Sequence, residues 1–182
     1  MKKLLSLLLA LAMILAIMPA ALAEETAEVQ PKAIDVMGNF TITCEIPEGY
    51  SYEDEYVSDL VYTGILYPAD VTKPLGVIVI AYNEEADGRS LSDLSEEEIQ
   101  AHIAEEKAQM GQDVIFSDGV TDYGTRILGY LVKDPEENRL EVYTLYMGYE
   151  ISFALLPPQG GTVTEEDFEF VRKFISEVWI NR

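Results

Sequence analysis

A chain of 182 residues with 33 acidic and 12 basic side chains carries a formal net charge of −21 at pH 7. This charge excludes nucleic acid and anionic membranes as partners, because long-range repulsion slows their approach and no basic stripe offsets it. The single cysteine, Cys44, also excludes an intrachain disulfide.

The first 23 residues have the pattern of a secretory signal peptide. Lys2 and Lys3 precede an uncharged, largely apolar run of 15 residues from Leu4 to Met18, and Ala21-Leu22-Ala23 forms the expected cleavage site. A run of that length is shorter than the roughly 20 residues that a membrane-spanning helix needs. We therefore expect an exported protein that begins at Glu24, carries no lipid anchor and is not inserted into the membrane after cleavage.

Cleavage at this site would remove two lysines and no acid. The remaining 159 residues would keep 10 basic and 33 acidic side chains, which gives a net charge of −23. This length fits one domain with a core of its own. We expect a polar leader at residues 24–37 and a single α+β domain at residues 38–182.

Apolar patterns predict the first strands of this domain. In FTITCEI, residues 40–46, the apolar side chains fall on one face, where the Cys44 thiol is expected to be buried and inert. The next strand, residues 60–68, ends at a proline. GVIVIAY, residues 76–82, is apolar at almost every position, which predicts a central strand covered on both faces.

The acidic stretch from Asn83 to Glu98 has two interpretations, of which the first is a calcium loop. The first ligand positions of such a loop would be filled by Asn83, Glu85, Asp87 and Gly88. The twelfth position, where a bidentate Glu is required, holds Leu94, and the preceding residues predict a strand rather than a helix.

The second interpretation is a connection that leads into a helix. Asp87-Gly88 would turn the chain, and Ser95 with Glu98 three residues later forms a capping box. The following helix would end near Gly111 and bury a stripe made of Ile99, Ile103, Glu106 and Met110.

The rest of the chain predicts four more strands and a final helix. The strands cover residues 113–119, 124–134, 138–147 and 149–157, with turns at 117–119, 134–138 and Gly148. The helix opens with Thr164 and Asp167 at the spacing of a cap and shows an apolar face of Phe168, Val171, Ile175 and Val178. This order predicts an α+β domain, a central antiparallel sheet of about six to seven strands flanked by two main helices.

The element order resembles the PsbP-like fold, an α/β/α sandwich. The resemblance rests on FTITCEIPEGY, the helix after GVIVIAY, the meander from Gly124 to Pro157 and the closing helix. This fold family includes the extrinsic PsbP subunit of photosystem II, a Ran-binding nuclear protein family and exported bacterial proteins. PsbP is associated with calcium and manganese, but none of its ligand residues matches a position in this chain, so the resemblance implies no site.

The common catalytic motifs are absent from the sequence. A hydrolase triad needs a base, and His102 is the one imidazole, expected at the edge of a buried helix stripe. The chain has no G-x-S-x-G, S-x-x-K or H-E-x-x-H motif and no paired cysteines. We expect no cofactor and a non-catalytic binding or accessory role, while a carboxylate-dependent hydrolase and a calcium-binding protein stay open as alternatives.

Clustered tyrosines among acids indicate a binding segment. Tyrosine offers a large contact area and a polar tip, which suits recognition of proteins or sugars. An acidic loop with such rings predicts a basic protein or a carbohydrate at the cell exterior as the partner. The expected partner-binding residues are Tyr50, Tyr52, Tyr56, Glu53, Asp54 and Glu55.

Overall fold

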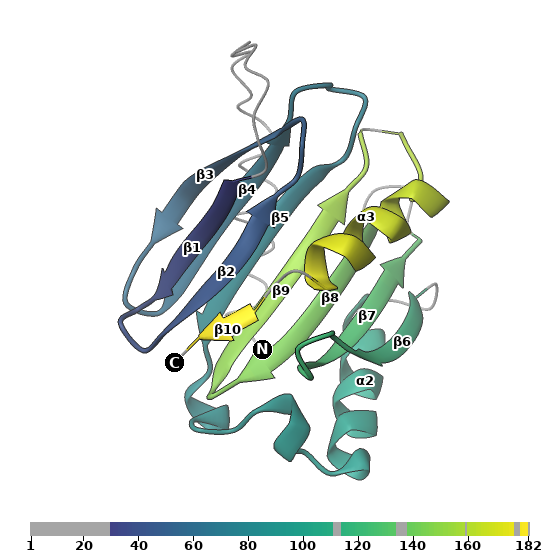
Figure 1. The fold of residues 1–182 in the computed structure, drawn as a ribbon. Coiled ribbons are helices and arrows are strands. Elements are labelled where there is room, and N and C mark those ends of the chain that lie inside the picture. Colours follow the sequence, from purple (N-terminus) through teal and green to yellow (C-terminus); the bar gives the residue numbers. More distant parts are fainter. Residues whose placement is uncertain (1–29, 111–113, 134–137, 159, 177–178, 182) are drawn as a thin grey trace.

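The computed structural model describes residues 30–110, 114–133, 138–158, 160–176 and 179–181. The predicted signal peptide and residues 24–29 of the predicted leader lie outside the described residues. Two antiparallel sheets and two main helices make up the described part (Figure 1).

The larger sheet has seven strands in the order β3-β4-β5-β9-β8-β7-β6, and each neighbouring pair is antiparallel. The strands are β3 (Tyr50–Val57), β4 (Val61–Pro68), β5 (Leu75–Tyr82), β6 (Val114–Val120), β7 (Arg126–Val132), β8 (Arg139–Tyr146) and β9 (Tyr149–Leu156). As predicted, β5 is an internal strand, and five consecutive residues of it are buried. Side chains from both faces of this strand therefore pack away from water.

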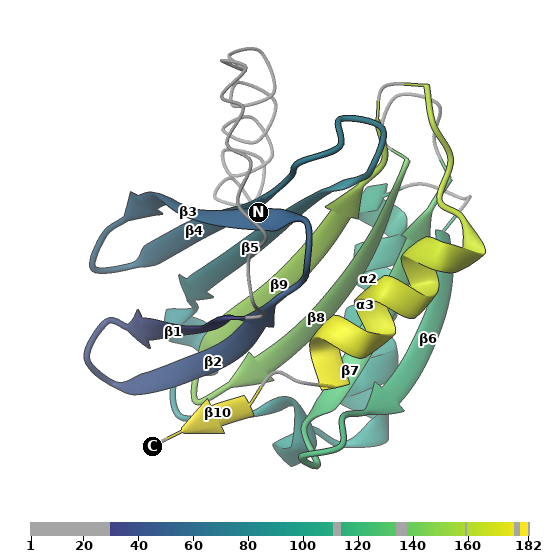
Figure 2. The same ribbon diagram turned by 45° about the horizontal axis from the view of Figure 1, so that its top comes forward.

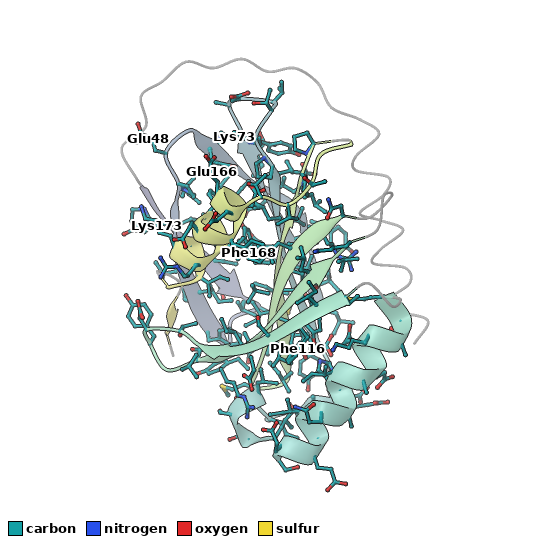
Figure 3. The ribbon with its side chains drawn as sticks, turned by 90° about the vertical axis from the view of Figure 1, so that its right-hand side faces the viewer. Glu48, Lys73, Phe116, Glu166, Phe168 and Lys173 are labelled. Atoms are coloured by element: carbon teal, nitrogen blue, oxygen red, sulfur yellow. The ribbon has the colours of Figure 1, made fainter. Side chains whose placement is uncertain are left out.

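The smaller sheet has three strands in the order β1-β2-β10. Its strands are β1 (Gln30–Val36), β2 (Phe40–Ile46) and β10 (Trp179–Asn181). This sheet and helix α3 (Glu165–Ser176) cover one face of the larger sheet, and Figure 2 shows the smaller sheet as a separate layer. Helix α2 (Glu96–Met110) lies on the opposite face, as Figure 3 shows from the side.

Two buried clusters hold these layers together. The larger one lies between the smaller sheet with α3 and the seven-stranded sheet, and it includes the buried Cys44. Burial raises the pKa of the Cys44 thiol to about 11, which keeps it protonated at neutral pH, as expected for an inert thiol. The smaller cluster lies between α2 and strands β6 to β8 and contains Ile99 and Ile103. Each buried Ile contributes about 1.5–3 kcal/mol to folding.

Both helices begin with the capping boxes that the sequence predicts. The Ser95 amide donates to Glu98 over 2.8 Å, and the Glu98 amide donates back to the Ser95 hydroxyl over 3.3 Å. Thr164 and Asp167 make the same exchange at α3. Each box satisfies amides that have no partner within the helix.

Three strands were not predicted. Strand β1 occupies half of the stretch expected as leader, because Gln30–Val36 pairs along its whole length with β2. Strand β3 replaces the expected acidic loop, and it forms one edge of the larger sheet with an irregularity between Asp54 and Tyr56. Strand β10 adds three residues to the other side of β2.

Two local predictions need correction. The turn expected at 117–119 lies instead at 121–125, where the Thr121 amide donates to the Thr125 carbonyl and Gly124 has a positive φ of 82°. Phe168 is 43% exposed, because α3 turns the row containing Val171 and Phe174 toward the core. Gly111 and Val178 fall outside the described residues.

The fold class is confirmed as α+β with a seven-stranded antiparallel sheet between two main helices. Within the described part of the chain, neither α2 nor α3 is long and apolar enough to cross a membrane.

Candidate functional site

The stretch from Asn83 to Glu98 is fastened to the hairpin between β8 and β9. The Gly148 amide donates to the Arg89 carbonyl over 2.8 Å, and its carbonyl accepts from the Asn83 amide over the same distance. The Met147 amide donates to the Ser90 hydroxyl over 3.2 Å. These hydrogen bonds hold together two segments that lie about sixty residues apart in sequence.

Glycine is required at the point where these segments meet. Met147 and Gly148 have φ values of 53° and 85°, the conformation of a two-residue hairpin turn. A Cβ atom on Gly148 would lie 2.9 Å from the Cα of Asp87, which is backbone and cannot move aside cheaply. The close approach therefore depends on the missing side chain.

Short capped turns give the stretch its shape. The Asn83 side chain accepts from the Glu85 amide over 3.0 Å and starts the 3₁₀ turn η1 (Glu84–Ala86). Ser90 and Asp93 form a capping box around η2 (Leu91–Asp93), whose Leu91 is buried. The stretch is therefore a connection, as the second interpretation predicts, and it also builds a surface.

That surface is one side of a polar cleft with a volume of about 750 Å³. The other side comes from the turn between β6 and β7 and from the end of β8. The volume lies in the range of small-molecule sites. The polar side chains that line the cleft are Ser90, Ser92, Asp93, Tyr123, Thr125, Arg126, Thr144 and Tyr146.

The charges of the cleft are largely compensated. Arg126 pairs with Asp118 over 2.6 Å and with Glu96 over 3.1 Å, and Arg126 holds the pKa of Asp118 below its ordinary value. The Asp93 carboxylate accepts from the Ser90 amide over 2.8 Å. The lining thus combines hydroxyl groups and tyrosine side chains with the Asp93 carboxylate, and its one positive charge, on Arg126, is paired.

Two of the predicted binding residues face the interior. Tyr50 is half-buried, donates to the Pro74 carbonyl over 3.1 Å, and packs against Phe170 with 5.1 Å between ring centroids. Tyr52 is also half-buried, and its hydroxyl is hydrogen bonded to that of Tyr62. Burial raises the pKa of Tyr50 to about 12.

The predicted acids lie on both faces of β3. Asp54 stays exposed on the side that faces β1, where it accepts from the Tyr62 hydroxyl and pairs with Lys32 of β1 over 2.8 Å. A Cβ atom on Gly64 of the adjacent strand would collide with the hydroxyl of Tyr52, so Gly64 makes room for this network. Asp54, Tyr52 and Tyr62 therefore join the smaller sheet to the larger one.

Tyr56 is the exposed ring of the predicted set, with 56% of its surface accessible. Glu53 and Glu55 are exposed on the same strand, and Glu55 accepts from Tyr67 over 2.9 Å. The structure thus does not gather the three rings on one surface. Binding by this segment stays a prediction, which applies to its outer residues.

No catalytic arrangement was predicted, and the described residues contain no group of three His, Cys, Asp or Glu side chains placed to hold a metal ion. In the calcium interpretation, the Asn83 oxygen would be a ligand, but it already accepts from Glu85. Arg89 pairs with Glu98 over 2.8 Å.

The cleft itself was not predicted. Its walls combine part of the Asn83–Glu98 stretch and the end of β8 before the predicted turn at Gly148 with Tyr123 and Arg126 from a third segment. The sequence did not indicate the cleft, because no pattern in a single sequence states which loops meet.

Comparison with solved structures identifies the fold. The solution structure of cyanobacterial PsbP (CyanoP) from Synechocystis matches with a TM-score of 0.51 at 15% sequence identity. The match covers 91% of this chain and 99% of the cyanobacterial chain. The chain therefore has the PsbP-like fold, as the element order predicted. No model of a known protein family and no curated protein matches the sequence.

Proposed function

We propose that the protein is exported and acts outside the cytoplasmic membrane as a non-catalytic binding module. The signal-like N-terminus supports export, and the absence of the common catalytic motifs from the sequence supports a binding role. The observation that carries the proposal is the polar cleft of about 750 Å³, assembled from three segments at one end of a rigid sheet.

The ligand proposed for the cleft is a neutral carbohydrate. Sugar rings present apolar faces and a rim of hydroxyl groups, which complement tyrosine rings and serine or threonine hydroxyls. Tyr123 supplies an exposed ring, the Tyr146 ring is partly buried against Phe40, and Ser90, Ser92 and Thr125 supply hydroxyls. Arg126 is already paired with two carboxylates, so the cleft has no unpaired positive charge that would demand an anionic ligand.

The outer side of β3 supports a second partner class, a basic protein segment. This strand is an edge of the larger sheet and exposes Glu53, Glu55 and Tyr56. Edge strands with unpaired backbone groups accept extended peptides, and acidic side chains favour basic ones. The bulge and the charges at this edge also protect the strand from pairing with other chains, so they do not by themselves indicate a peptide-binding site. We therefore place the principal binding site in the cleft.

The test uses two tyrosines with nearly equal exposure. Tyr123 in the cleft is 55% exposed and Tyr56 on β3 is 56% exposed, so Tyr→Ala removes a comparable ring in each case. The protein is first screened against arrays of neutral oligosaccharides and of basic peptides. The strongest neutral oligosaccharide should bind Tyr123→Ala at least about tenfold more weakly by calorimetry and bind Tyr56→Ala as well as it binds the natural protein.

Two results would contradict non-catalytic carbohydrate binding in the cleft. Binding of basic peptides that Tyr56→Ala weakens and Tyr123→Ala leaves intact would transfer the function to the edge strand. Reproducible turnover of an oligosaccharide, abolished by one acid-to-amide change, would replace the binding module by a carboxylate-dependent hydrolase.

A further inference from the structure

A second group of polar side chains, none of which lines the cleft, lies beneath α2. Tyr130 of β7 stands directly opposite Glu141 of β8 in the antiparallel pairing, so both side chains point to the same face of the sheet. Helix α2 covers this face and brings Glu106 over the strands, one helical turn after His102. The His102 ring lies 5.1 Å from that of Tyr143, which fixes the register of α2 on β8.

Negative charge exceeds positive charge in this group. Glu141 pairs with Arg139 over 3.0 Å, and Glu150 of β9 accepts from Asn83 over 2.8 Å. Burial, followed by the charges of Glu141, Glu150 and Glu105, raises the pKa of Glu106 to about 7, and Arg139 opposes this effect. Of the described basic side chains, Arg139 is the one whose charge reaches Glu106.

Two polar atoms of this group are buried without a hydrogen-bond partner. They are the hydroxyl of Tyr130, a residue with 1% of its surface exposed, and Nε2 of His102. The pairing with Glu141 places the Tyr130 side chain on the same face of the sheet as that carboxylate, and burial, followed by the charges of Glu106 and Glu141, raises the pKa of Tyr130. Buried polar atoms are nearly always satisfied, and an exception indicates a missing water, ion or ligand.

We propose that Glu106, Glu141 and Tyr130 bind an organic cation through its primary ammonium group. An ammonium carries three N–H donors and no acceptor, so it can donate to two carboxylates and to the tyrosine oxygen at once. Burial lowers the pKa of His102, which leaves its imidazole neutral, so His102 adds no positive charge that would oppose a cationic ligand.

An ammonium fits better than a metal ion. The described carboxylates are not placed as a group of three that could ligate one metal. The two carboxylates are partly accessible, since the Glu141 side chain keeps 19% of its surface exposed and Glu106 is half-buried, and the Tyr130 hydroxyl is buried. Phe116 of β6 lies between the sheet and α2 (Figure 3). The Lys107 ammonium lies 5.7 Å from the centroid of the Phe116 ring, so it is occupied by this contact.

The test uses n-pentylamine as the probe and n-pentanol as its neutral analogue, followed by nuclear magnetic resonance on the purified protein. A salt concentration of about 150 mM screens diffuse binding to the acidic surface. Glu97→Gln is the matched control, because it removes one exposed carboxylate from the first turn of the same helix. Tyr130→Phe removes the unpaired hydroxyl and keeps the ring.

Pentylamine should bind the natural protein and Glu97→Gln at one saturable site and bind Glu106→Gln at least about tenfold more weakly. Tyr130→Phe should also weaken binding, and pentanol should not bind. Calorimetry at pH 7 in two buffers should show proton release for the natural protein and none for Glu106→Gln, because the cation favours the ionised carboxylate. Equal, non-saturable binding to all variants would mean that a water molecule satisfies Tyr130 and would overturn the proposal, with no effect on the cleft.

Discussion

The main-chain amide of Met147 donates a hydrogen bond of 3.2 Å to the side-chain hydroxyl of Ser90. Met147 belongs to the hairpin between β8 and β9, and Ser90 belongs to the connection that follows β5. The same hydroxyl takes part in the capping box of η2. One side chain thus fixes both the local turn and its position against the hairpin, and the cleft depends on both.

Replacing Ser90 by Ala should therefore lower the free energy of unfolding by about 1–2 kcal/mol, the cost of a lost cap and an unpaired amide. Urea denaturation measures this change. Ser92→Ala, which removes the next hydroxyl of the cleft lining, should leave the unfolding free energy within about 0.5 kcal/mol of the natural value. An equal loss of unfolding free energy in both variants would show that the hydrogen bond between Met147 and Ser90 does not stabilise the protein.

Gly148→Ala should destabilise the protein more than Gly160→Ala. Both glycines have positive φ, 85° and 77°, so both substitutions carry the same backbone strain of about 1 kcal/mol. Only at Gly148 would the new Cβ meet backbone, 2.9 Å from the Cα of Asp87, whereas at Gly160 it would meet nothing within 4 Å. Thermal unfolding of the two variants should differ by several degrees, and equal melting temperatures would contradict the close approach.

The stability of the protein should change between about pH 4.5 and 7 because of Glu106. Burial and neighbouring carboxylates raise its pKa in the folded state from 4.5 to about 7, so the folded state binds this proton more tightly than the unfolded state. The stabilisation is complete below about pH 4.5 and is lost as the pH rises through 7. Glu106→Gln should be more stable than the natural protein at pH 8, by about 1 kcal/mol after screening by solvent, and no more stable at pH 4.

Denaturation at both pH values measures this difference, with Glu97→Gln as the control of equal charge change. A Glu97→Gln profile that equals the Glu106→Gln profile would assign the effect to net charge rather than to the buried site.

Calcium should bind only diffusely to the Asn83–Glu98 stretch. Arg89 and Glu98 are paired with each other, and the Asn83 oxygen is engaged by Glu85. Calorimetry at about 150 mM salt should show no stoichiometric site, and Ser95→Ala should cost about 1 kcal/mol with or without calcium. A single site that survives this salt and disappears in Asp87→Ala would establish the calcium loop instead.

The regular elements could be predicted because each carries its own periodicity. FTITCEI alternates cleanly, and it forms β2 with the predicted bounds. YSYEDEYV alternates less visibly, since the row that holds the half-buried Tyr50 and Tyr52 continues with the acid Asp54, which pairs with Lys32 of another strand. A charged residue neutralised by a distant partner hides a strand from pattern analysis.

The apolar face of the last helix was ambiguous for a different reason. Phe168, Phe170 and Phe174 offer two helical rows of similar hydrophobicity, and stacking on Phe153 of the larger sheet selects the row with Phe174. At the N-terminal end of α3, Glu166 pairs with Lys73 across 3.4 Å (Figure 3), a contact between segments more than ninety residues apart. Long-range contacts of this kind also assemble the cleft, which is why the cleft was absent from the sequence prediction.

The role of the cleft can be tested by nuclear magnetic resonance on the isotope-labelled protein titrated with the neutral oligosaccharide that binds it best on an array. We predict that the amide shifts that change are confined to residues 88–93, 123–126 and 144–147, the three segments that line the cleft. Saturable shift changes confined to β3, or none at concentrations that saturate the array, would contradict carbohydrate binding in this cleft.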